Sequence, residues 1–270
     1  MVCFLNSFSF IAQSHTADLL THAIISTSET VQRLVHERLE AEGLVKVLLP
    51  LGTTDATERH LPIFVSADLA TKSRVVIIFG QATQDLGILA HRVIGGPGGV
   101  NKGCMVSVVQ ILKKQVSSPT DATAPGIILA NMGQTWWWPD GKRALCPLDR
   151  HGVPMPSAVH WGVRPQPGIN TIPGNSSPPQ HVKYMLDKVV PALVNPEARL
   201  DILDLSDDVV RYLDTIWDRL GPRMNSLAIL NGFTNNNDLK SDAFKTFLKD
   251  VSSTYSYDLG AISISGAQIY

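Results

Sequence analysis

The sequence of 270 residues contains little cysteine and no long apolar run. Its three cysteines, Cys3, Cys104 and Cys146, are widely spaced and form no Cys-x-x-Cys pair. They offer no disulfide framework, so we predict an intracellular protein of the nucleus or cytoplasm. No stretch reaches the roughly 18 apolar residues that a membrane helix needs. Residues 1–12 are apolar, but the first Lys or Arg is Arg33, so the charged start of a signal peptide is missing and we predict no membrane association.

The sequence also has no excess of charge of either sign. Lys plus Arg number 23 and Asp plus Glu number 24, which gives a formal net charge of −1. Such a balance provides no global attraction to nucleic acid, so direct nucleic-acid binding is not predicted. Hydrophobic residues make up 44% and charged residues 17%, enough apolar surface for a sizeable core in a chain of one-domain length.

What the sequence does contain is an alternation of strand and helix patterns. Residues 74–80 form a continuous β-branched run, which is typical of a strand buried on both faces of a parallel sheet. We predict an α/β fold, a three-layer sandwich with a mainly parallel sheet and helices on both faces. The predicted helices cover 31–44, 85–94, 105–116, 178–194, 209–220 and 242–255, and the predicted strands cover 45–51, 61–69, 74–80, 126–131, 200–205, 226–233 and 261–266.

Two regions depart from this alternation. Residues 132–180 are rich in Pro, Gly, Ser and Trp and show little periodicity, so we predict an irregular loop or lid inserted in the domain. Residues 1–27 are predicted to be a divergent or poorly ordered segment that precedes a single domain over 28–270.

Two motifs fail the tests for nucleotide and metal binding. In the glycine-rich run 95–103, Lys102 is followed by glycine where a P-loop needs Ser or Thr, so we expect a flexible turn. Cys146, His151 and His160 match no standard zinc spacing. We therefore predict no metal site and no cofactor.

Aromatic and basic residues suggest a partner surface. Trp136, Trp137 and Trp138 precede a Pro-Asp-Gly turn, and their rings either fold back over the sheet or form a recognition surface. The segment 69–120 holds six Lys or Arg residues against one acid, Asp85, which indicates either a solvated face or a site for an acidic partner. The predicted surface consists of Trp136, Trp137, Trp138, Lys102, Lys113 and Lys114.

Ser206 ends a strand pattern that runs straight into a helix, which is where an α/β-hydrolase places its nucleophile. That elbow requires glycine two residues to either side, and Asp204 and Asp208 stand there instead. Carboxylates so close to the serine oppose an alkoxide-like nucleophile and an oxyanion. Ser206 equally suits the N-cap of the following helix.

Five segments follow one another in a recognisable order: IFVSADLATKSRVVIIFG, GIILAN, PPQHVKYMLDKVVPAL, DILDLS and SLAILNGF. This order resembles that of the Arb-two (argonaute-binding-protein-two-like) domain family, and the resemblance covers roughly residues 30–270. The likeness is greatest to the free-standing fungal members of this family. Other members lie on the C-terminal side of class II histone deacetylases. The resemblance implies an α/β-hydrolase-like fold. It also implies a link to chromatin silencing or small-RNA pathways, with histone, deacetylase or argonaute-type partners.

The resemblance also indicates whether the residues around Ser206 match a catalytic elbow. Animal members carry a His-Ser-x-Gly-Gly elbow, whose serine matches Ser206. Leu205 stands in place of the histidine, and Asp208 and Val209 stand in place of the glycines. The family's acid would fall at 231–233, where the sequence Asn-Gly-Phe has no carboxylate.

The family's histidine would fall at or beyond Tyr270, so the resemblance implies a chain that is C-terminally incomplete. We therefore predict a non-catalytic interaction domain. The alternative is an esterase-like serine hydrolase, with Ser206 as nucleophile and His160 or His181 as base.

Overall fold

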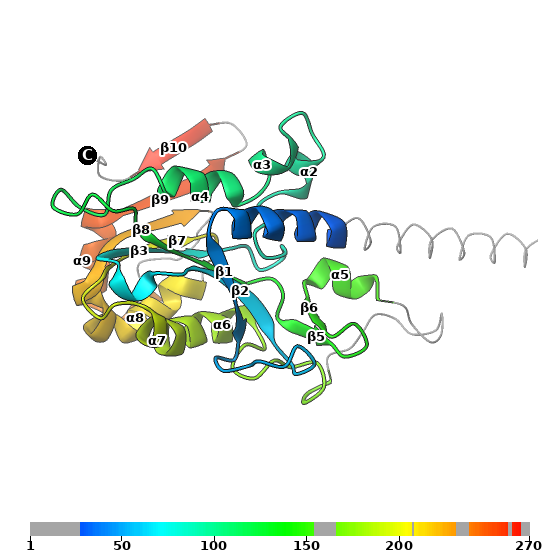
Figure 1. Ribbon diagram of the computed structural model, residues 1–270. Coiled ribbons are helices and arrows are strands. Elements are labelled where there is room, and N and C mark those ends of the chain that lie inside the picture. Colours follow the sequence, from blue (N-terminus) through cyan, green and yellow to red (C-terminus); the bar gives the residue numbers. More distant parts are fainter. Residues whose placement is uncertain (1–27, 154–165, 207, 231–237, 259–260, 266–270) are drawn as a thin grey trace, which may run out of the picture.

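The computed structural model describes residues 28–153, 166–206, 208–230, 238–258 and 261–265 (Figure 1). Eight strands form one mixed sheet in the order β1-β2-β4-β3-β7-β8-β9-β10, and β5 and β6 form a separate hairpin. The strands are β1 (Leu44–Leu49), β2 (Leu61–Ser66), β3 (Arg74–Phe79), β4 (Gly126–Ala130), β5 (Trp136–Trp138), β6 (Arg143–Leu145), β7 (Arg199–Asp204), β8 (Met224–Leu230), β9 (Ser252–Asp258) and β10 (Ala261–Ser265).

Helices connect most of these strands. The first helix covers 28–41. It is followed by the 3-10 turn η1 (Leu69–Thr71), α2 (His91–Ile94), α3 (Gly99–Lys102), α4 (Val106–Leu112), α5 (Pro147–His151), α6 (Pro178–Tyr184), the π-helical turn η2 (Met185–Val189), α7 (Val190–Leu193), α8 (Asp208–Leu220), the 3-10 turn η3 (Gly221–Arg223) and α9 (Asp242–Val251). No helix in the described ranges is long and apolar enough to cross a membrane.

The centre of the sheet is parallel and its margins are antiparallel. Strands β4, β3, β7, β8 and β9 pair in parallel, whereas β1 with β2, β2 with β4, and β9 with β10 pair antiparallel. The predicted α/β fold with a mainly parallel sheet is therefore confirmed.

The β-branched run of β3 packs against two separate cores. Val75, Ile77 and Phe79 belong to the core under α6, α7 and α8. Val76 and Ile78 point the other way, into the core under the first helix and α4. Alternate strand residues face opposite sides of a sheet, so a central strand covered on both faces must be apolar throughout. Helices cover both faces, as predicted (Figure 1).

The chain reverses its direction across the sheet between β3 and β7. The connection from β3 leads to β4 on one side, and the connection from β7 leads through α8 to β8 on the other. In such sheets a crevice opens outside the carboxyl ends of the two strands where the order reverses. The segments that follow Phe79 and Asp204 meet at this point, since the backbone N–H of Leu205 donates to the Phe79 carbonyl at 3.0 Å.

The predicted helix 85–94 was wrong over most of its length. Only His91–Ile94 is helical, because the chain turns at Gly87, whose φ of 84° lies in the left-handed region. A Cβ at Gly87 would lie 3.0 Å from side-chain atoms of Val35 and Leu39, so the loop packs directly on the first helix.

The predicted helix 242–255 ends early. The helix stops at Val251, and Ser252–Asp258 form β9 parallel to β8. The segment SSTYSYD is rich in Ser, Thr and Tyr, of which Thr and Tyr favour strands, and the edge of β8 offers it backbone partners.

The insertion 132–180 is more regular than predicted. The three tryptophans form strand β5, which pairs antiparallel with β6 and leads into α5. The N–H of Trp137 donates to the carbonyl of Asn170 at 2.9 Å, which ties the hairpin to the returning chain. The domain division at residue 28 stays a prediction, because residues 1–27 lie outside the described residues.

Candidate functional site

Ser206 lies at the carboxyl end of the parallel strands, two residues beyond the end of β7 and just before α8. It is partly buried, and it follows one of the two strands between which the strand order reverses. The predicted strand–turn–helix setting of this serine is therefore present.

The hydrogen bonds of Ser206 are those of a turn. Its hydroxyl donates to Asp204 Oδ1 at 3.1 Å, and its backbone N–H donates to the same oxygen at 2.8 Å. Asp204 is fully buried at the end of β7. The Ser206 hydroxyl is therefore bound to the negatively charged carboxylate of Asp204. This charge opposes the formation of an alkoxide on the serine.

His181, one of the two histidines predicted as a base, forms hydrogen bonds to other residues through both ring nitrogens. It is fully buried on α6. Its Nε2 accepts a hydrogen bond from the backbone N–H of Asn131 at 3.0 Å, so its Nδ1 carries the proton and donates to Asn175 Oδ1 at 2.7 Å. Burial lowers the pKa of His181 to about 3, and the ring is neutral. His160 lies outside the described residues.

The network around His181 fixes the chain after β4. The side chain of Asn131 donates to the carbonyl of Pro62 and to Gln134 Oε1, both at 3.0 Å. The N–H of Gln134 returns a bond to Asn131 Oδ1 at 3.1 Å. These buried groups satisfy one another, so the arrangement serves to hold the loop.

The structure separates the predicted partner residues. Trp136 and Trp137 are 7% and 3% exposed, so their rings lie in the protein interior, and only Trp138 is partly exposed. The guanidinium of Arg143 lies 5.5 Å from the centre of the Trp138 ring. The alternative in which the rings fold back into the protein therefore describes Trp136 and Trp137.

The predicted lysines lie on another part of the surface. Lys102 is at the end of α3 and Lys113 follows α4, and these helices lie apart from the β5–β6 hairpin (Figure 1). Lys113 forms an ion pair with Glu42 at 3.2 Å, whereas Lys102 and Lys114 are exposed. Lys72 and Arg74 of the basic segment 69–120 also pair with carboxylates, Asp68 and Asp201, so much of its positive charge is compensated.

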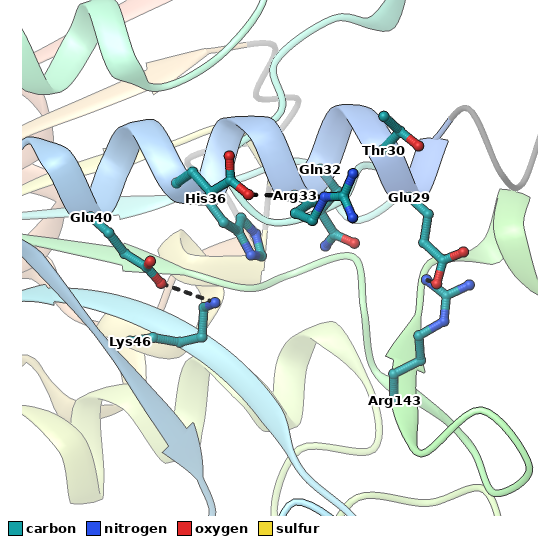
Figure 2. A pocket seen from close by; sticks show the side chains of 9 residues that line it. Glu29, Thr30, Gln32, Arg33, His36, Glu40, Lys46 and Arg143 are labelled. Atoms are coloured by element: carbon teal, nitrogen blue, oxygen red, sulfur yellow. Dashed lines mark ion pairs between the residues drawn. The ribbon is translucent and has the colours of Figure 1, made fainter.

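A groove lies between the first helix and the strands β1 and β6, which carry Lys46 and Arg143 (Figure 2). Its volume is about 630 Å³. Three ion pairs lie in it: Lys46–Glu40 at 3.1 Å, Arg143–Glu29 at 3.0 Å and Arg33–Glu37 at 3.9 Å. Its lining residues are Glu29, Thr30, Gln32, Arg33, His36, Glu37, Glu40, Lys46 and Arg143. The groove therefore presents charges of both signs to solvent, and Arg143 joins it to Trp138.

His36 is the titratable ring in this groove. Burial and the nearby charge of Lys46 lower its pKa to about 4. Its Nε2 lies 3.2 Å from the carbonyl of Leu86, which can only accept, so Nε2 carries the proton. Its ring meets Phe64 edge-on at 5.0 Å between centres. The groove thus contains one neutral imidazole among its charged groups.

The cysteine and histidines examined for zinc spacing are not brought together by the described structure. Cys146 is buried and His151 is exposed at the end of α5, while His160 lies outside the described residues. Cys146 lies instead beside Asp85 and Asp149. Burial, followed by the charge of Asp85, raises the pKa of Cys146 to about 12 and that of Asp149 to about 6.

Sequence reasoning missed the cluster around Cys146 and the groove on the first helix. In the sequence Asp85 is distinguished only as the single acid of a basic segment, and no spacing joins it to Cys146. The groove residues of the helix lie at positions 29, 30, 32, 33, 36, 37 and 40. Their recurrence every three to four residues is a helical signal that could have indicated a shared polar face.

The Arb2 domain matches residues 13–258. The match spans well over half of the chain, so the chain belongs to the Arb2 domain family, and the family predicted from the order of segments is confirmed. No curated protein and no solved structure matches the chain. The likeness to free-standing fungal members and the link to silencing complexes stay predictions.

Proposed function

We propose that this Arb2 domain is a non-catalytic interaction domain that works in the nucleus or cytoplasm. The observation that carries the proposal is the hydrogen bond that the Ser206 hydroxyl donates to the buried carboxylate of Asp204. A serine nucleophile needs a base that accepts its proton. His181 cannot take that role, since both of its ring nitrogens are bound to Asn131 and Asn175.

The groove along the first helix is the proposed docking surface, with Trp138 at its edge. Its lining carries carboxylates at Glu29, Glu37 and Glu40 and cations at Arg33, Lys46 and Arg143. Each of these ion pairs includes at least one well-exposed side chain, and such pairs are individually weak, so a partner with complementary charges can exchange them at little cost. A partly exposed Trp next to an Arg supplies the type of side chains enriched at binding hot spots.

The family suggests the partner class. Arb2 membership supports a link to silencing complexes, with a histone, a deacetylase or an argonaute-type protein as the partner. The predicted lysines at 102, 113 and 114 lie apart from the groove and are proposed as a second, electrostatic contact region. That region favours an acidic segment of the same partner.

Binding assays with purified core histones, a class II deacetylase and an argonaute test this proposal. We expect one of them to bind the chain, and to lose at least ~tenfold affinity when Arg33→Glu and Glu37→Lys are combined or when Trp138→Ala is introduced. The matched control, Lys188→Glu on the opposite side of the sheet, should bind normally. Binding that survives both groove variants would reject the groove as the docking surface.

The second candidate function is an esterase-like serine hydrolase that uses Ser206. The position of this serine between β7 and α8, at the reversal of strand order, supports it. A fluorophosphonate probe separates the two functions. We expect no labelling of the folded protein, and labelling that disappears in Ser206→Ala would establish the hydrolase and overturn the non-catalytic proposal.

A further inference from the structure

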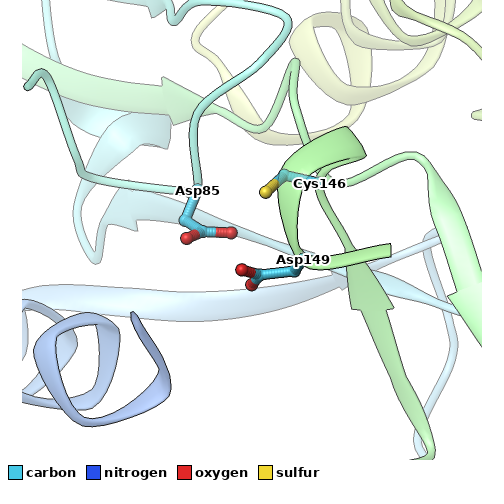
Figure 3. Close-up of side chains that lie close together, drawn as sticks. All are labelled: Asp85, Cys146 and Asp149. Carbon is cyan, nitrogen blue, oxygen red and sulfur yellow. The ribbon is translucent and has the colours of Figure 1, made fainter. Parts of the chain in front are cut away.

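We propose that Asp85, Cys146 and Asp149 bind one divalent transition-metal cation, and that Zn²⁺ fits this donor set best. The three side chains offer two carboxylate oxygens and one sulfur, and these ligand atoms lie within 4.8 Å of one another. Figure 3 shows the two carboxylates facing each other, with Cys146 Sγ turned toward them. This site is independent of the docking groove and of Ser206.

Two distant segments build the site. Asp85 lies in the loop between β3 and α2, whereas Cys146 immediately precedes α5 and Asp149 lies in the first turn of that helix. Residues three apart on a helical turn lie on the same side, so Cys146 and Asp149 face the loop together. Gly87, two residues after Asp85, allows the loop to pack closely on the first helix and keeps Asp85 at this position.

One oxygen in the cluster has no hydrogen-bond donor. The side chain of Asp85 is 1% exposed, and its Oδ2 accepts a hydrogen bond from Ser28 at 3.1 Å. Its Oδ1 is buried, and no donor among the described residues reaches it. Burying a carboxylate without a full set of partners costs free energy. A bound cation would satisfy this oxygen and the facing carboxylate at once.

The positive groups beside the cluster do not already fill this role. His91 Nε2 lies 3.7 Å from Asp85 Oδ2, and its side chain is 37% exposed. Arg143 attracts Asp149 at longer range but forms its ion pair with Glu29 at 3.0 Å. The pairing with Asp85 raises the pKa of His91, so His91 acts on Oδ2 and leaves Oδ1 without a donor among the described residues.

The donor types select the metal. Zn²⁺ takes cysteine sulfur at about 2.3 Å and carboxylate oxygen or histidine nitrogen at about 2.0–2.2 Å in a tetrahedron. Neighbouring ligand atoms in such a tetrahedron are about 3.4–3.8 Å apart. The present ligand atoms lie within 4.8 Å of one another, so they need to approach by no more than about 1.4 Å. A thiolate disfavours Mg²⁺ and Ca²⁺, which prefer oxygen ligands.

A bound ion would cross-link two parts of the chain that lie far apart in the sequence. It would tie the loop after β3, at the carboxyl edge of the sheet, to α5 and the β5–β6 hairpin. Since binding to the native state stabilises it by mass action, the metal-bound protein is expected to unfold at a higher temperature than the metal-free protein.

Metal binding to the untagged full chain tests the proposal. After removal of metal with a chelator, we expect elemental analysis to find one Zn²⁺ per chain following exposure to Zn²⁺ and dialysis. With Co²⁺ as a spectroscopic probe, we expect the d–d bands of tetrahedral coordination and a thiolate-to-cobalt charge-transfer band. Mg²⁺ and Ca²⁺ should leave the unfolding temperature unchanged.

Two cysteine variants form a matched pair. Cys146→Ser should abolish the charge-transfer band and weaken Zn²⁺ binding by at least ~tenfold, because serine is a poorer ligand. Cys104→Ser should keep both, because Cys104 is equally buried but belongs to the core beneath α4. Asp85→Asn and Asp149→Asn should each weaken Zn²⁺ binding to a similar degree.

Failure of the folded wild-type chain to take up Zn²⁺ or Co²⁺ would overturn the proposal. So would a Co²⁺ spectrum without thiolate charge transfer, a readout that needs no variant to fold. Ca²⁺ binding as tight as Zn²⁺ binding would equally reject a transition-metal site. None of these outcomes depends on whether the groove binds a partner.

Discussion

Two aspartates, Asp201 and Asp85, are buried to nearly the same extent but have different partners. Asp201 on β7 is 5% exposed and accepts bonds from Arg74, from Asn225 at 2.7 Å and from Ser226 at 2.6 Å. Asp85 is 3% exposed, and among the described residues only its Oδ2 has a hydrogen-bond donor. The first is a completed structural ion pair; the second is the ligand of a proposed cation.

The difference shows that burial of a charge does not by itself indicate a site. A carboxylate whose acceptor positions are filled by protein donors holds the fold together. A carboxylate that faces a second carboxylate and a thiol, with an oxygen left over, has capacity for a ligand. Variants of Asp201 and Asp85 test this contrast, and acidification tests a third buried group, His181.

The largest effect is expected from Asp201→Ala. Removing this carboxylate leaves Arg74 and two polar side chains without their acceptor in a largely buried position. Breaking a buried ion pair in this way costs about 3–5 kcal/mol. Urea unfolding followed by circular dichroism should show a correspondingly lower free energy of unfolding.

The control for Asp201→Ala is Asp68→Ala. Asp68 pairs with Lys72 at 3.0 Å, but its side chain is 57% exposed. Exposed ion pairs contribute about 0–1 kcal/mol, so this variant should unfold almost like wild type. Equal losses of unfolding free energy in the two variants would show that Asp201 contributes no more to stability than a residue in an exposed ion pair.

Acidification is expected to lower the stability by an intermediate amount, because of the lowered pKa of His181. Its pKa is lowered from 6.5 in the unfolded chain to about 3 in the folded protein. Between these values the unfolded chain binds a proton that the folded protein does not, so stability is complete above about pH 6.5 and falls as the pH decreases. From pH 7 to pH 5 the loss through this residue is about 2 kcal/mol.

Urea unfolding of wild type and His181→Asn at both pH values measures this contribution. The variant should be less stable at pH 7, because it loses bonds to Asn131 and Asn175, but its loss on acidification should be smaller by about 2 kcal/mol. His151→Asn, at an exposed position, should retain the wild-type pH dependence. An unchanged dependence in His181→Asn would show that this ring is not the group responsible.

The smallest effect on the metal-free protein is expected from Asp85→Asn. This substitution removes the repulsion between two buried carboxylates while an amide oxygen can still accept from Ser28. In the presence of a chelator, the free energy of unfolding should stay within about 1 kcal/mol of wild type or rise. A loss as large as that of Asp201→Ala would identify Asp85 as a structural residue and would contradict the contrast between them.

The fold could be read from the sequence wherever local pattern and tertiary setting agree. The run Val75–Phe79 is apolar at every position because helices cover both faces of β3, and the apolar run itself reports this. The prediction failed at Gly87 and at Ser252, where long-range contacts override local preference. At Gly87 the loop packs against the first helix, and at Ser252 the edge of β8 provides backbone partners.

The candidate site was only partly predictable. The position of Ser206 between a strand and a helix follows from local pattern, and so does the presence of Asp204 beside it. That Trp136 and Trp137 are buried while Trp138 is partly exposed depends on how the β5–β6 hairpin packs, which three identical residues in a row cannot reveal.

The sequence by itself determined most of the strands and helices around the parallel centre of the sheet, the burial of β3 on both faces and the family, because each of these is encoded in neighbouring residues or in their order. Only the tertiary structure decided which side chains meet. Asp85 reaches Cys146 and Asp149 because the loop after β3 and the start of α5 converge at one edge of the sheet. Such contacts depend on chain topology and packing, and they leave no periodic signal in the sequence.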